Sequence, residues 1–214
     1  MDFTLPRGYS AMRYNLLIDE LPQDAGGLQI NTSFRVGILL EQLLQDESVS
    51  DEQTVDLALG LLFPHGYSNR EQAWHVLLWF FRCGKPVSHS GGTQTAHSSK
   101  AYDFDEDASL IVAAFQQAYG VDLTKEDLHW WRFRALFDGL PENCRICKIM
   151  GYRTADTTDM PESAKSFYSK MKARYALQSP KARPHTAAER DAALKAKIDE
   201  QFRKAEAWIK KEPL

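Results

Sequence analysis

The stretch from Tyr102 to Arg153 constrains the fold most, because it holds the two densest apolar helical patterns of the chain on either side of one tight turn. In its first half the residues at helical spacing form one apolar stripe: Leu110, Ile111, Ala114, Phe115, Ala118 and Tyr119. Asp105 or Asp107 is placed to cap this helix, since a short carboxylate accepts hydrogen bonds from the free N–H groups of the first turn. Gly120 follows the last apolar residue, where a helix commonly ends.

The second half predicts a helix from about Lys125 to Leu140, opened by Thr124 with Asp127 in a variant capping box. Its apolar surface is unusually wide, with Leu128, Trp131, Ala135 and Leu136 on one side and Trp130, Phe133, Phe137 and Leu140 on another. Such a helix is buried on two sides, either by the protein's own core or by a partner. We favour the core, while the alternative is a partner groove anchored by tryptophan. The candidate partner-binding residues of that groove are Trp130, Trp131, Phe133 and Phe137.

The amino-acid sequence of this stretch resembles that of a known family. Three runs carry the resemblance, in chain order YDFDEDASLIVAAFQQAYGVDL, LHWWRFRALFDGLP and KIMGYR. They are similar to the bacteriophage "gene product fifteen" family of siphovirus tail-module proteins. The N-terminal INTSFRV also resembles the way in which this family opens its first helix, and the resemblance covers most of residues 13–178. It implies a mainly helical tail assembly chaperone that holds the tape measure protein soluble while the tail tube polymerises. The family brings no catalytic residues, so none is carried over.

The residues before this stretch are predicted to form a helical scaffold behind a small β-hairpin. The strand-like composition at 14–19 and the alternation at 28–31 flank a cluster of turn formers, which predicts the hairpin. Helices are predicted over residues 34–45, 51–63 and 69–83. The apolar face of the first includes Leu39 and Leu44, and that of the second includes Leu57. Residues 85–100 have almost no apolar side chains and are predicted to be a mobile loop.

Beyond the tryptophans, helices are predicted from Asn143 to Met150 and from Pro161 to about Gln178, completing a helical domain over residues 1–178. Residues 179–185 contain two prolines and form a linker. Residues 186–214 are predicted to form a charged amphipathic helix. The fold class is therefore mainly α, a helical bundle with a small N-terminal β-hairpin and a C-terminal helical extension.

The C-terminal helix has a narrow apolar seam and a basic character. A seam of this kind is typical of a docking face or a self-association strip, and its candidate partner-binding residues are Leu194, Ile198 and Phe202. Residues 165–211 carry thirteen Lys or Arg against five Asp or Glu, whereas residues 1–164 carry thirteen against twenty-three. A basic segment on an acidic body can contact nucleic acid, an acidic partner or a second copy, and a solvated helix explains it equally well. Nucleic acid is the least supported partner, because the basic residues alternate with acids and no binding motif is present.

No motif requires catalysis, a metal or a cofactor. Cys144 and Cys147 have C-x₂-C spacing, but a zinc site needs further ligands and a thioredoxin-like motif needs a βαβ context. Two structural thiols on a helix are favoured, and a thiol oxidoreductase would require a depressed thiol pKa. Asp103, Asp105 and Asp107 resemble the start of a calcium loop but lack its Gly and bidentate Glu. The sequence therefore predicts a protein that is not an enzyme.

The first 17 residues lack the apolar run of a signal peptide, and no segment is apolar enough to span a bilayer. With three cysteines and no secretory signal, the expected location is the reducing cytoplasm of a bacterial host. The resemblance implies the tape measure protein as partner, with the tail tube protein and a second copy of this chain as further candidates. The alternative function is a DNA-associated packaging or regulatory protein that acts through the basic C-terminal segment.

Overall fold

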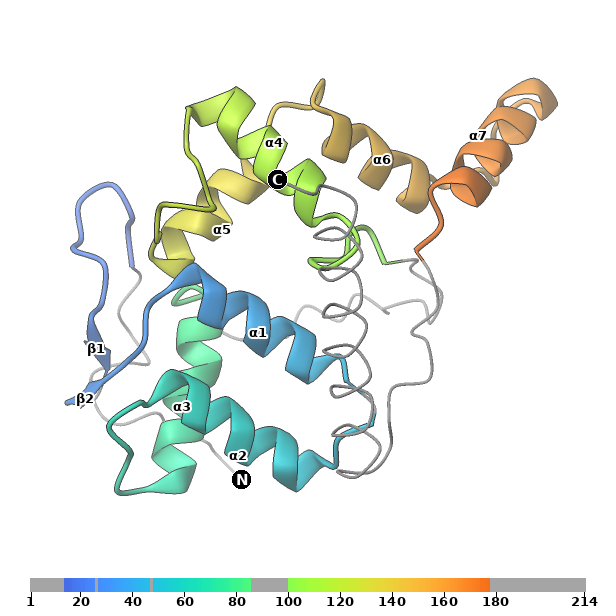
Figure 1. The fold of residues 1–214 in the computed structure, drawn as a ribbon. Coiled ribbons are helices and arrows are strands. Elements are labelled where there is room, and N and C mark those ends of the chain that lie inside the picture. The colour runs from blue at the N-terminus through green and yellow to red at the C-terminus, as the bar shows by residue number, and fades with distance from the viewer. Residues whose placement is uncertain (1–13, 26, 47, 86–99, 178–214) are drawn as a thin grey trace, which may run out of the picture. The chain divides into compact units, whose positions relative to one another are not determined.

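The chain is mainly helical, as the sequence predicts (Figure 1). The computed structural model describes residues 14–25, 27–46, 48–85 and 100–177. The helices of these residues are α1 (Phe34–Leu44), α2 (Asp51–Leu62), α3 (Arg70–Phe81), α4 (Ala108–Tyr119), α5 (Trp130–Asp138), α6 (Arg145–Thr154) and α7 (Glu162–Arg174). All of them lie within one compact unit of the chain.

Several predictions fall on other parts of the sequence. The predicted mobile loop, apart from its two ends, the linker and the C-terminal helix lie outside the described residues. The seam residues Leu194, Ile198 and Phe202 lie there as well. The docking or self-association role of that seam therefore stays a prediction.

The predicted N-terminal hairpin is confirmed, but its first strand was placed wrongly. The strands are β1 (Asp24–Ala25) and β2 (Leu28–Gln29), which pair antiparallel. Residues 14–19 form a turn instead, in which the N–H groups of Ile18 and Asp19 donate to the carbonyl of Asn15 at 3.0 and 2.9 Å. The side chains of Asn15 and Asp19 accept further backbone N–H groups of the same turn. Local side-chain hydrogen bonds of this kind compete with strand pairing, which explains the error.

The helices α1 to α3 begin where the sequence predicts. The Oγ atom of Ser33 accepts the N–H of Arg35 at 3.2 Å, and the side chain of Asn69 accepts the N–H of Gln72 at 2.9 Å. The predicted apolar faces of α1 and α2 are partly wrong, because three leucines are exposed: Leu39, Leu44 and Leu57. The buried face of α1 instead includes Gly37, where an added Cβ would lie 2.1 Å from the Cε3 atom of Trp130. The close contact between Gly37 and the indole ring thus sets the orientation of the helix, and the spacing of apolar residues in the sequence does not predict it.

The helix α5 begins five residues later than the sequence predicts. Before it, His129 forms an isolated antiparallel bridge with Ser33: Phe34 donates to the carbonyl of Leu128 at 2.8 Å, and Trp130 donates to the carbonyl of Thr32 at 2.7 Å. Thr124 does not cap the helix, because its hydroxyl donates to Asp122 at 2.6 Å. The cap is His129, whose Nδ1 accepts the first-turn N–H of Trp131 at 3.1 Å.

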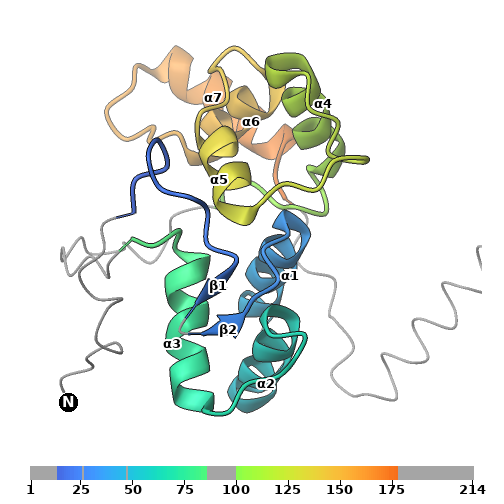
Figure 2. The ribbon, with the colours of Figure 1, turned by 90° about the vertical axis from the view of Figure 1, so that its left-hand side faces the viewer.

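Within the described residues the helices pack in two groups that α5 connects. In one group α1 contacts α2 and α2 contacts α3, while in the other α4 contacts α6 and α6 contacts α7 (Figure 1). The helix α5 contacts α1, and its indole groups reach the end of α3. Figure 2 shows the hairpin beside α1 and α3. Buried hydrophobic side chains from both groups form one cluster.

Candidate partner-binding site

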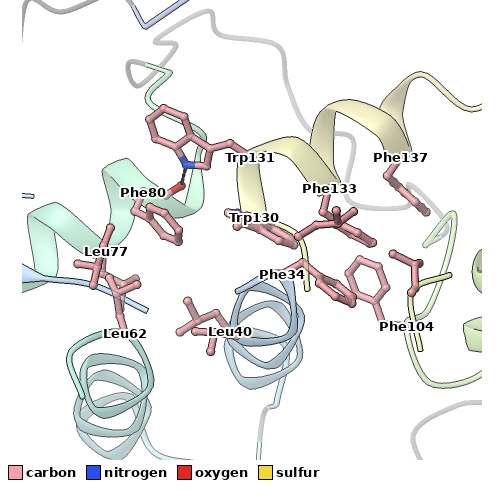
Figure 3. Packing of buried hydrophobic residues seen from close by; sticks show 14 of the residues in the cluster. Phe34, Leu40, Leu62, Leu77, Phe80, Phe104, Trp130, Trp131, Phe133 and Phe137 are labelled. Atoms are coloured by element: carbon pink, nitrogen blue, oxygen red, sulfur yellow. Dashed lines mark hydrogen bonds between the residues drawn. The ribbon is translucent and has the colours of Figure 1, made fainter. Parts of the chain in front are cut away.

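The two tryptophans of α5 are held inside the protein. Each has 1% of its surface exposed. The indole N–H of Trp130 donates to the carbonyl of Phe81 at 3.0 Å, and that of Trp131 donates to the carbonyl of Phe80 at 2.7 Å (Figure 3). Both indoles therefore satisfy their one polar group on the C-terminal end of α3, and their hydrogen bonds fasten α5 to α3.

The other two candidate residues of α5 complete an aromatic cluster. Phe133 is fully buried and stacks on Phe34 and Phe115, with ring centroids 5.0 and 5.1 Å apart. Phe137 lies 6.0 Å from Phe133, and Figure 3 shows these rings side by side with Phe104. The structure thus brings all four candidate residues of α5 together in the core. A partner would have to open that core to reach most of them, although Trp131 also lines a pocket.

A buried ion pair, which the sequence did not reveal, holds α4 to α6. The guanidinium of Arg153 binds both carboxylate oxygens of Asp107, at 2.6 and 3.0 Å. Asp107 precedes α4 as the sequence predicts, but its carboxylate makes no cap and is used in this pair. A signal was present in the sequence, because Arg153 follows Ile146 and Ile149 on one helical face, and all three are buried. Since the pair has two parallel hydrogen bonds and is almost inaccessible to solvent, we assign it a structural role.

Two of the cysteines, Cys83 and Cys147, have a raised thiol pKa. Burial, with a smaller contribution from Cys144, raises the pKa of Cys147 to about 11. Burial likewise raises the pKa of Cys83 to about 11. A thiol nucleophile requires the opposite shift, so the structure gives no support to a thiol oxidoreductase. Among the described residues, no group of three His, Cys, Asp or Glu side chains is arranged to hold a metal ion.

A pocket of about 540 Å³ opens where the C-terminal end of α3 approaches α5. Its apolar wall is formed by Tyr14, Leu16, Phe81 and Trp131. Its polar wall is formed by Arg82, Lys85, Arg134 and Asp138. The pocket therefore combines an aromatic wall with three cations and one carboxylate.

The cations of the pocket differ in how they are paired. Arg134 donates to the hydroxyl of Tyr102 at 3.0 Å and to Asp138 at 3.2 Å. Within the described part of the chain, Arg82 and Lys85 form no ion pair, and the buried Nε of Arg82 has no hydrogen-bond partner. The pocket therefore keeps an unbalanced positive charge.

The turn at residues 14–19 borders this pocket and exposes apolar side chains. Leu17 and Ile18 have 92% and 80% of their surface exposed. The turn is held on the core by Tyr14, whose ring meets that of Trp131 edge-on with centroids 4.7 Å apart and whose hydroxyl donates to the carbonyl of Glu20. Large apolar side chains held in water by an ordered turn are typical of an interaction surface. The sequence missed this surface because it assigned the turn to a strand.

Neither a curated protein nor a solved structure matches the chain. No helix of the described residues is long and apolar enough to cross a membrane. The family model described as Bacteriophage Gp15 protein matches residues 17–177, which include the hairpin and all helices of the described chain. The match extends over more than half of the sequence and agrees with the resemblance carried by residues 102–153. The chain therefore belongs to the bacteriophage Gp15 protein family and is a phage structural or assembly protein.

Proposed function

We propose that this protein is a non-enzymatic tail assembly chaperone that binds the tape measure protein and keeps it soluble while the tail tube assembles. The observation that carries the proposal is the family match across residues 17–177. The resemblance of residues 102–153 to that family implies this role. In the proposed cycle, many copies coat one tape measure chain in the host cytoplasm until tail tube subunits displace them.

The described surface supports a binding role of this kind. A chaperone for an apolar helical chain must present apolar side chains to water without unfolding. Leu17 and Ile18 meet this requirement, because the turn that carries them is fixed by its own hydrogen bonds. The aromatic residues of α5 remain in the core, where they hold α3 and α1 in place.

The first experiment is co-expression with the tape measure protein of the same phage, followed by size-exclusion chromatography with light scattering. We expect a soluble complex of defined stoichiometry, whereas the tape measure protein expressed alone precipitates. If the tape measure protein stays insoluble and this protein elutes alone, the proposed function is refuted.

The role of α5 needs its own variant. Replacing Trp130 by Ala removes a core side chain, and we expect a large loss of stability of about 3–5 kcal/mol. Tape measure binding by the fraction that remains folded should be unchanged if Trp130 belongs to the core alone. A folded variant that no longer binds would assign the partner groove to α5.

The excess of positive charge over residues 165–211 motivates a second candidate, a DNA-associated packaging or regulatory protein. Such a protein binds DNA with an affinity that falls steeply as salt rises. A fluorescence-anisotropy titration with duplex DNA at two salt concentrations tests it, and an absence of binding at low salt would exclude it.

A further inference from the structure

We propose that the pocket between residues 14–16, the end of α3 and α5, together with the exposed Leu17 and Ile18, is where the partner chain docks. The occupant is a helical segment of the tape measure protein in which an acidic side chain flanks apolar ones. The inference rests on the proposed function, since it names the docking site and the chemistry of the bound segment.

The charge of the pocket selects an acidic group. Residues 1–164 carry an excess of acidic side chains, so three cations gathered at one pocket are a local exception. The carboxylate of Asp138 is engaged by Arg134, whereas Arg82 and Lys85 have no ion-pair partner among the described residues. A carboxylate entering the pocket would therefore meet two uncompensated cations, and complementary charge of this kind gives specificity and faster association.

The apolar part of the site is continuous with the pocket. Leu16 lines the pocket, and Leu17 and Ile18 follow it directly in the same turn. Because Tyr14 fastens this turn to Trp131, the exposed side chains are ordered before the partner arrives, which lowers the entropy cost of binding. A pocket of about 540 Å³ accepts a few side chains rather than a whole helix, so the bound segment lies across the opening and inserts neighbouring residues of one face.

Two variants test the two parts of the site in the full-length protein. The double variant Leu17→Ser/Ile18→Ser removes the exposed apolar side chains, and Lys85→Glu reverses one cation of the pocket. Both changes lie on exposed positions, so the thermal unfolding midpoint should stay at the wild-type value. The matched controls are Leu57→Ser, an exposed leucine of α2, and Lys125→Glu, an exposed lysine that does not line the pocket.

Affinity for the purified tape measure protein, kept soluble with a fusion partner, is measured by biolayer interferometry. We expect each site variant to weaken binding by about tenfold or more and each control by less than about twofold. Added salt should weaken wild-type binding more than that of Lys85→Glu. Site variants that bind like the wild type, or controls that weaken binding equally, would overturn the inference while leaving the proposed function intact. If the wild type itself fails to bind, the proposed function fails and the inference falls with it.

Discussion

Replacing Arg153 with Met is expected to destabilise the protein by about 3–5 kcal/mol, the usual cost of removing one partner from a buried ion pair. The two partners are almost inaccessible, with 3% of Asp107 and 8% of Arg153 exposed. Water therefore cannot solvate the carboxylate that the substitution leaves behind. The loss should be large although the pair itself contributes little relative to apolar residues of the same volume.

The contacts of the guanidinium set this magnitude. Besides its two bonds to Asp107, Arg153 donates from one terminal nitrogen to the carbonyl of Ala101 at 3.0 Å and from Nε to the carbonyl of Tyr175 at 2.6 Å. Methionine fills part of the volume of the arginine side chain but leaves the carboxylate of Asp107 without its cation. The carbonyls of Ala101 and Tyr175 each lose a hydrogen-bond donor. Lysine keeps the charge but cannot form the planar fork, so Arg153→Lys should recover only part of the lost stability.

The assay is urea unfolding followed by circular dichroism, with a double-mutant cycle between Arg153→Met and Asp107→Leu. The double variant removes both charges, so it should be more stable than the sum of the two single losses predicts. A loss of less than about 1 kcal/mol for Arg153→Met would refute the reasoning. Strictly additive losses in the cycle would refute it as well, because they would mean that the two side chains do not interact.

Three further predictions concern α5, its contact with α1, and a thiol. Burial lowers the pKa of His129 below its usual value of 6.5, so the folded protein should lose stability as pH falls below 6.5. Asparagine is a cap that does not titrate, so His129→Asn should reduce the change in the free energy of unfolding between about pH 7 and about pH 5. Gly37→Ala should destabilise the protein by about 1–3 kcal/mol in urea unfolding, because the added Cβ would lie 2.1 Å from an atom of the Trp130 ring. Gly60→Ala, where the added Cβ meets open space, should stabilise α2 by up to about 1 kcal/mol. Cys147, with its pKa raised to about 11, should react with iodoacetamide at pH 8 on the order of a hundredfold more slowly than free cysteine in peptide mapping, and an equal rate would contradict that shift.

The parts of the fold that sequence predicted well depend on neighbouring residues. The caps at Ser33 and Asn69 bind N–H groups two and three residues away, and Gly120 ends α4 with a φ of 69°. Capping interactions of this kind are determined by residues that are close together in the sequence. The helices before residue 120 and most of their boundaries followed from it.

The start of α5 could not be predicted in this way. Thr124 with Asp127 three residues on has the pattern of a capping box, yet residues 123–125 form only a turn and α5 begins at Trp130. The reason lies almost a hundred residues away, where the segment around Ser33 pairs with His129. A tertiary contact between residues so far apart in sequence overrides the local capping preference, and the spacing of apolar residues in α5 does not indicate that contact.

The proposed docking site was invisible for the same reason. It requires residues 14–16, 81–85 and 131–138 to meet, and no local pattern specifies that meeting. The aromatic residues of α5 attracted attention because tryptophan is common both in cores and in interfaces, and sequence alone does not separate the two. Burial separates them: the indoles are enclosed, while Leu17 and Ile18 are exposed.

The small size of this apolar surface fits the proposed function better than a wide aromatic groove would. A chaperone that tail tube subunits must displace has to release its client. The proposed contact, made by two exposed side chains and one pocket, would give each copy modest affinity. Many copies along one tape measure chain would still cover its apolar surface, while each single copy dissociates quickly. A groove formed by the four aromatic residues of α5 would require the core to open at every binding event, and each release would have to close it again. Under the proposed function, the enclosed core and the small exposed turn would keep the stability of this protein separate from its affinity for the tape measure protein.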